Sequence, residues 1–184
     1  MYARNRDLQK TKDQLIETLS KDSTRYDILI EVVKICYYMR DYSSAYHYYT
    51  KIENIIEDQE LSILIGENAK IGLIFSEMGL KEKSEKYFSD YKLYADSDNS
   101  IYKHLSLAVY YSYMDDKNKA IEHLKLFSQE DNYFYWIPVF LKIDPLIDNI
   151  KDLPELKKIL NDIDTKFWNN HKRIKASLEE KGLL

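Results

Sequence analysis

Hydrophobic residues recur every three or four positions along most of this chain, a spacing typical of amphipathic helices. The central stretch, residues 71–91, shows the pattern most clearly. An apolar run containing Gly72 stops at Gly79, and a second apolar run resumes one short turn later. A glycine just past a helix suits the left-handed conformation that ends many helices, and a glycine within a helix lets a second helix approach closely. The stretch is therefore predicted to be a helical hairpin.

The preceding segment shows the same alternation of apolar stripes and short polar turns. Its stripes predict a first helix that ends near residues 20–24, a second helix over residues 27–39 and a third helix lined by Tyr42, Ala45, Tyr49 and Ile52. Arg40 and Asp41 form the predicted turn between the last two. The polar run at residues 57–60 then separates these helices from the central hairpin, although the third helix could continue into it.

The segment after the central hairpin begins with the small polar run 95–100, which is predicted to be a loop. Ser100 is a suitable N-cap for the next helix. A third hairpin follows, with its turn at Asp115 and Asp116. These two acidic residues could suggest acid–base or metal chemistry, but a short turn between helices favours the same residue types.

The last fifty residues contain two helix-start signals, in which proline follows a polar or extended residue: Asp144-Pro145 and residues 152–155. The second signal opens an apolar stripe that consists of Leu156, Leu160, Ile163, Phe167, His171, Ile174 and Leu178. Steps of three and four residues place all of them on one face of a single helix. Gly182 is predicted to end that helix.

A small residue recurs at the start of the second helix of each hairpin. The residues are Ala45, Ser84 and Ala120, so the spacings are 39 (84 minus 45) and 36 (120 minus 84). These spacings lie near the period of about 34 residues that is known for tetratricopeptide repeats.

Particular residues resemble the motifs of the tetratricopeptide repeat (TPR) family. Its Leu-Gly-x-x-Tyr element is similar to Val32-Val33 with Cys36, Ile71-Gly72 with Phe75, and Leu107-Ala108 with Tyr111. Its Ala-x-x-x-Phe element is similar to Ala45 with Tyr49, Ser84 with Phe88, and Ala120 with Leu124. The chain departs from the family where Leu29, Asn68 and His104 replace its tryptophan.

The resemblance implies an all-α fold, a right-handed α-solenoid of helix-turn-helix repeats with a C-terminal capping helix. One domain would span residues 1–184, with a half-repeat helix over 1–24, three degenerate repeats over 26–129 and capping helices over 133–184. The tail also resembles the C-terminal ends of TPR arrays in bacterial regulatory proteins, on the residues Asp144-Pro145-Leu146 and Leu153-Pro154-Glu155-Leu156.

Composition narrows the classes of function. The net charge of -4 argues against a protein that mainly binds phosphate backbones. The single Cys36 cannot form an internal disulfide, and no run of about 18 apolar residues could cross a membrane. Because the first residues also lack the apolar core of a signal peptide, a cytoplasmic protein without nucleic-acid or membrane partners is expected.

No set of residues predicts catalysis, a metal site or a cofactor. The histidines His47, His104, His123 and His171 are far apart in the sequence, and none has further ligands at metal-binding spacing. The cluster Lys166, Lys172, Arg173 and Lys175 could touch nucleic acid, but acidic neighbours favour a solvated helix face.

The expected function is therefore a non-enzymatic scaffold that binds a protein or peptide. In TPR proteins the first helices of the hairpins line a concave groove. The residues predicted to line it here are Lys34, Tyr37, Tyr38, Lys70, Leu73, Glu77, Tyr102, Leu105, Val109 and Tyr113. The alternative is a regulatory or oligomerisation segment of a larger bacterial signalling or transcription protein. In that case the N-terminal helix or the stripe over 156–178 forms a contact between subunits.

Overall fold

The computed structural model describes residues 7–59 and 65–184, and within these the side chains of all but residues 54–59. All regular secondary structure in the described ranges is helical, and successive helices pack in pairs. The all-α prediction is therefore confirmed. Residues 1–6 of the predicted N-terminal segment, and Glu60 of the polar run 57–60, lie outside the described residues.

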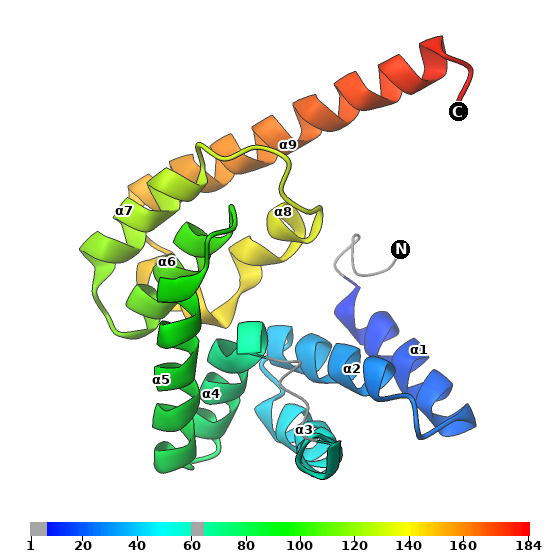
Figure 1. Ribbon diagram of the computed structural model, residues 1–184, viewed down its shortest axis with the longest axis vertical. Coiled ribbons are helices and arrows are strands. Elements are labelled where there is room, and N and C mark those ends of the chain that lie inside the picture. The colour runs from blue at the N-terminus through cyan, green and yellow to red at the C-terminus, as the bar shows by residue number, and fades with distance from the viewer. Residues whose placement is uncertain (1–6, 60–64) are drawn as a thin grey trace. The chain divides into compact units, whose positions relative to one another are not determined.

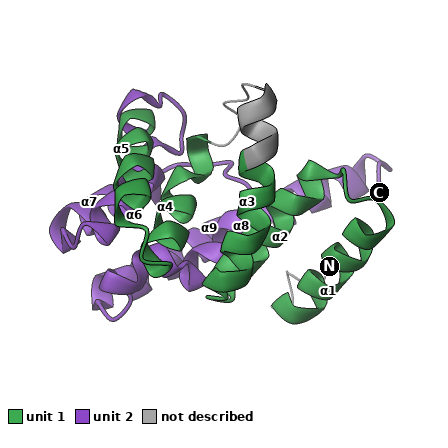
Figure 2. Ribbon diagram, turned by 90° about the horizontal axis from the view of Figure 1, so that it is seen from below, with its two compact units in different colours: residues 1–94 green, residues 95–184 purple. Residues whose placement is uncertain are grey.

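The chain divides into two compact units, residues 1–94 and 95–184, which Figure 2 colours separately. The boundary falls within the second helix of the central hairpin. The helices of the first unit are α1 (Leu8–Lys21), α2 (Tyr26–Tyr38), α3 (Tyr42–Gln59), the 3-10 turn η2 (Ile65–Glu67), α4 (Asn68–Glu77) and most of α5 (Lys81–Ser97). One continuous domain stays a prediction.

The second unit consists of a hairpin, short helical turns and one long helix. Its elements are α6 (Lys103–Tyr113), α7 (Lys117–Phe127), α8 (Trp136–Phe140), the 3-10 turns η3 (Leu141–Ile143) and η4 (Pro145–Ile150), and α9 (Pro154–Glu180). Helix α9 begins against α7 and α8, and Figure 1 shows its second half continuing past them.

The same turn ends the first helix of each hairpin. A residue with positive φ stands just past α2, α4 and α6: Arg40 (58°), Gly79 (76°) and Asp115 (58°). In each case the next amide donates to the carbonyl five residues earlier, at 2.9 Å, which is the Schellman arrangement. The three turns are spaced by 39 and 36 residues (79 minus 40, 115 minus 79), so the structure repeats with the spacing seen in the sequence.

The small residues at the start of the second helices are buried, as expected for close packing. Ala45 and Ala120 have no exposed surface, and Ser84 is nearly as buried. A Cβ atom added to Gly72 would lie 2.8 Å from the ring of Phe88 on α5. Since real Cβ atoms do not approach that closely, the predicted architectural role of Gly72 is confirmed.

Helix α1 packs against α2, so the predicted half-repeat helix has a covered face (Figure 1). Lys12 on α1 forms an ion pair with Asp41 at 2.7 Å, and the same carboxylate accepts from the Ser44 amide at the start of α3. The hydrogen bond from Lys12 lowers the pKa of Asp41. The free thiol of Cys36 is buried in the interface, and burial raises its pKa.

Two helix boundaries differ from the prediction. Helix α5 continues through Ser97, because Ala95 faces inward and is fully buried, so the loop begins only at Asp98. The Ser100 hydroxyl does accept from the Tyr102 amide at 3.1 Å, but it opens a turn before α6 rather than capping that helix.

Both predicted helix starts of the tail coincide with the start of a helical element, but only the first has a side-chain cap. The Asp144 carboxylate accepts from the Leu146 amide at 3.0 Å and Pro145 occupies the first position of η4. Helix α9 begins at Pro154 as predicted, although no side chain caps it. Gly182, with φ 65°, follows the end of α9.

Candidate functional site

The predicted groove residues fall on both units. Six lie on α2 and α4 of the first unit: Lys34, Tyr37, Tyr38, Lys70, Leu73 and Glu77. Four lie at or in α6 of the second unit: Tyr102, Leu105, Val109 and Tyr113. Because each unit is described by itself, a groove that continues across both stays a prediction.

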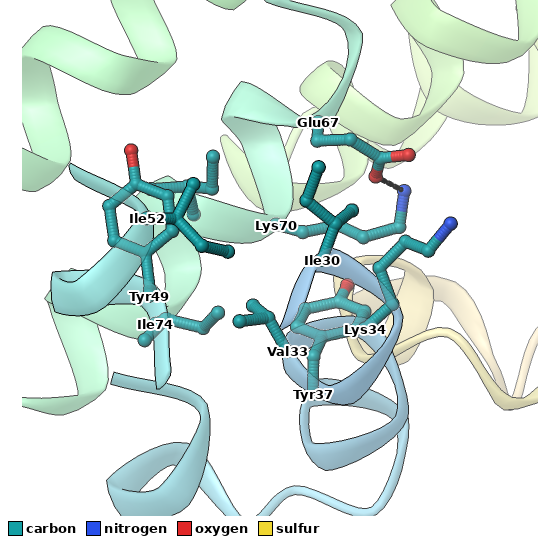
Figure 3. Close-up of a pocket in the computed structure, with 10 residues that line it drawn as sticks. Ile30, Val33, Lys34, Tyr37, Tyr49, Ile52, Glu67, Lys70 and Ile74 are labelled. Carbon is teal, nitrogen blue, oxygen red and sulfur yellow. Dashed lines mark hydrogen bonds and ion pairs between the residues drawn. The ribbon is translucent and has the colours of Figure 1, made fainter. Parts of the chain in front are cut away.

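Within the first unit, Lys34, Tyr37 and Lys70 come together around one apolar hollow (Figure 3). The other lining residues come from α2, α3, η2 and α4: Ile30, Val33, Tyr49, Ile52, Glu67, Ile71 and Ile74. The hollow has a volume of about 20 Å³. This space accepts the tip of one aliphatic side chain, whereas small-molecule sites are usually about 300 Å³ or more.

Sequence reasoning missed Ile52 and Glu67 as members of this site. Ile52 is nearly fully buried on α3, and it lines the same hollow as Ile30 only because α3 and α4 both pack beside α2. Glu67 stands three residues before Lys70, a spacing that places two residues of a helical turn side by side. That spacing is a local signal that could have identified Glu67.

Charged residues border the hollow. Lys70 Nζ lies 2.6 Å from Glu67 Oε2, and Lys34 Nζ lies 2.6 Å from Glu31 Oε1. Burial alone would raise the pKa of the Glu67 carboxyl, but the charges of Lys70 and Lys34 outweigh it and leave that pKa below its ordinary value. The border is thus polar and charged around an apolar floor.

The predicted residues of the first unit differ in exposure. Tyr37 has no exposed surface and stacks edge to face on Tyr38, with ring centroids 5.2 Å apart. Leu73 is buried as well, whereas Glu77 is exposed. Tyr37 can therefore shape the hollow only from within, and the half-buried residues around it are Ile30, Lys34, Glu67 and Lys70.

In the second unit, Tyr102 takes part in packing within the unit. Its hydroxyl accepts from the Phe134 amide at 3.0 Å, and its ring stacks against the rings of Phe134 and Trp136. Leu105 and Val109 are buried, and Tyr113 is half-buried.

Two of the separated histidines meet in the fold. His104 on α6 and His123 on α7 place their Nδ1 atoms 3.0 Å apart, with ring centroids at 5.2 Å and planes inclined by 27°. The distance between the Nδ1 atoms is about two ring radii shorter than the distance between the centroids, so the rings meet edge to edge. One imidazole therefore donates a hydrogen bond to the other. Among the described residues, no three His, Cys, Asp or Glu side chains gather as a metal site would require.

The basic cluster of the sequence divides into two parts. Lys166 donates to the carbonyls of Ser128 and Glu130, at 2.8 and 3.1 Å, just past the end of α7. Lys172, Arg173 and Lys175 are exposed, as expected for a solvated helix face. Lys166 therefore fixes α9 to the end of α7 through backbone carbonyls.

The apolar stripe of α9 changes from buried to exposed along the helix. Leu156 and Ile163 have almost no exposed surface, whereas Ile174 is 50% exposed. Beside the exposed part lies a second hollow, of about 210 Å³, between the turn at Asn132 and Tyr133 and the α9 residues Phe167, Asn170, His171 and Ile174. This face is a second candidate surface for binding.

Comparisons with protein-family models, with curated proteins and with solved structures found no match. A separate test for membrane-spanning segments found no helix of sufficient length and hydropathy among the described residues.

Proposed function

We propose that the chain is a non-enzymatic protein-binding module built from TPR-like helical hairpins. The hollow between α2, α3 and α4 would receive the tip of one aliphatic side chain of an extended peptide or a partner helix. The observation that carries this proposal is an apolar hollow bordered by the ion pairs of Lys34 and Lys70, on the helices that line the groove in TPR proteins.

The chemistry of the hollow suits a peptide better than a metabolite. The hollow, of about 20 Å³, has an apolar floor that can contact the tip of a small side chain, and its charged border offers hydrogen bonds to the adjacent backbone and polar groups. The repeated turns support the TPR-like part of the proposal, since each places its second helix at the same point after the first.

The experiment is a selection of random displayed peptides on the immobilised chain, followed by affinity measurement on variants. Selected peptides should share an aliphatic residue flanked by polar ones. Ile30→Trp, which fills the hollow from its half-buried edge, should weaken their binding at least tenfold. Ile28→Trp, on the same helix but outside the hollow, is the matched control and should leave the affinity within about twofold.

Circular dichroism on both variants verifies that they remain folded. Equal affinity for wild type and Ile30→Trp would reject the hollow as the binding site. Failure to select any peptide would reject the proposed function itself.

A second candidate function is a regulatory or oligomerisation segment of a larger bacterial signalling or transcription protein. The exposed second half of α9 favours it, because a stripe of apolar residues on a solvated helix is a common contact surface between subunits.

A further inference from the structure

The second half of α9 carries an apolar stripe that leaves the core of its own unit. Phe167 still contacts the Tyr133 ring, with centroids 6.2 Å apart, but His171 and Ile174 are exposed and Leu178 is half-buried. These four residues are separated by four, three and four positions, which is the spacing of the contact stripe of a two-helix coiled coil.

We infer that this stripe pairs with the same stripe of a second copy of the chain, with the two α9 helices antiparallel. This inference rests on the second candidate function and is independent of the peptide hollow in the first unit. An antiparallel pair places Phe167 opposite Leu178 of the second copy and His171 opposite Ile174, and one two-fold axis relates both contacts.

The residues that flank the stripe favour this antiparallel arrangement. On one side, Trp168 would face Lys175 of the second copy, so that an ammonium lies against an indole ring. On the other side, Asn170 would face Ser177, a pair that can form a hydrogen bond. Lys172 and Arg173 point outward in this register, so the concentrated positive charge does not face its own copy.

The hollow beside α9 completes the contact. It lies next to Phe167, at the level where Leu178 of the second copy would approach, and its volume of about 210 Å³ accommodates an aliphatic side chain. The antiparallel orientation also opposes the two helix dipoles, which is favourable.

The size of the contact sets the expected strength. Residues 167–180 span about 21 Å at 1.5 Å per residue. Such a pair buries less than a standard protein interface, so we expect a dimer that dissociates in the micromolar range.

Sedimentation equilibrium over a wide range of concentrations tests the association. Wild type should move from one chain mass towards two. Ile174→Glu places two carboxylates in the stripe and should weaken the dimer at least tenfold. Ala176→Glu introduces the same residue two positions away, on the outward face, and should change the dissociation constant by less than twofold.

Because Ile174 is half exposed, Ile174→Glu should retain the wild-type circular dichroism spectrum. A wild type that stays monomeric at all concentrations would overturn the inference. So would an Ile174→Glu variant that dimerises as wild type does. The Ile174→Glu variant should bind the selected peptides with the affinity of wild type. Loss of the dimer can then be told apart from loss of peptide binding at the hollow of the first unit.

Disulfide trapping tests the orientation. Asn170→Cys and Ser177→Cys are made in separate chains, and Cys36 does not compete because it is buried. Under mild oxidation the equal mixture should cross-link, whereas each variant alone should not, since antiparallel pairing brings 170 against 177. Cross-linking of each variant alone, with none added by mixing, would show another packing and reject the antiparallel pair.

Discussion

Helix α4 of the first unit and helix α9 of the second show how one kind of sequence pattern leads to two outcomes. Apolar residues of α4 are buried from its first turn to its last, and the ring of Phe88 closes against Gly72. The stripe of α9 is just as regular, yet Leu156 and Ile163 are buried whereas Ile174 is half exposed. Periodicity thus defines a face of a helix, and the neighbouring elements decide how much of that face becomes core.

The largest expected effect separates the two halves of α9. Ile163→Ala should lower the free energy of unfolding by about 2–4 kcal/mol, because it empties a buried site. Ile174→Ala, on the same stripe, should cost less than about 1 kcal/mol in dilute solution, where the side chain faces water. Urea unfolding at low protein concentration measures both, and equal costs would contradict the division of the stripe.

The next effect tests how tightly the central hairpin is closed. Gly72→Ala should destabilise the chain by about 1–2 kcal/mol, because the new Cβ overlaps the buried Phe88 ring by more than the better helix propensity of alanine offsets. Gly66→Ala is the matched control, since its Cβ would lie 3.6 Å from Tyr94, an ordinary contact. A neutral Gly72→Ala would show that Phe88 can move aside and that the closure is looser than described.

The repeated turn predicts stability changes of opposite sign for two substitutions, Gly79→Ala in the first unit and Asp115→Gly in the second. Gly79→Ala should cost about 1 kcal/mol, because alanine is strained at a φ of 76°. Asp115→Gly should stabilise by up to about 1 kcal/mol, because it relieves the same strain at 58°. Thermal unfolding of both variants measures the difference, and stability changes of the same sign would refute the equivalence of the turns.

The smallest effect concerns acid and the hollow of the first unit. The pKa of Glu67 is lowered in the folded chain. Its ion pair with Lys70 therefore stabilises the fold at pH values above 4.5, the ordinary pKa of a glutamate. That stabilisation is lost as the pH falls through the lowered pKa. The stability difference between wild type and Glu67→Gln, at most about 1 kcal/mol at pH 6, should therefore shrink towards pH 3. A constant difference over this range, measured by urea unfolding, would rule out the ion pair as its source.

Helix ends and helix starts could be predicted from local sequence because they depend on near neighbours along the chain. Gly79 as a helix end and Asp144-Pro145 as a helix start follow from backbone preferences that act within a few residues. The prediction failed at residues 95–97, where a small polar run resembles a loop. Ala95 faces inward and is fully buried, so its packing extends the helix.

The candidate site needed contacts between distant segments. Lys34 and Lys70 were expected on one face, and they do border one hollow, but Ile52 joined it only through the packing of α3. His104 and His123 are 19 residues apart, and no local pattern indicates that their Nδ1 atoms meet at 3.0 Å. The predicted continuation of the groove to Tyr102 and Tyr113 stays a prediction.

The sequence by itself determined the helices, their turns and the period of the repeat, because helix propensity, capping and left-handed turns are decided over one or two helical turns of chain. Only the tertiary structure decided which apolar positions are covered. Burial depends on what lies across from a side chain, and for Ile52, Ala95 and Ile174 that partner, or the water in its place, is not written in the neighbouring residues.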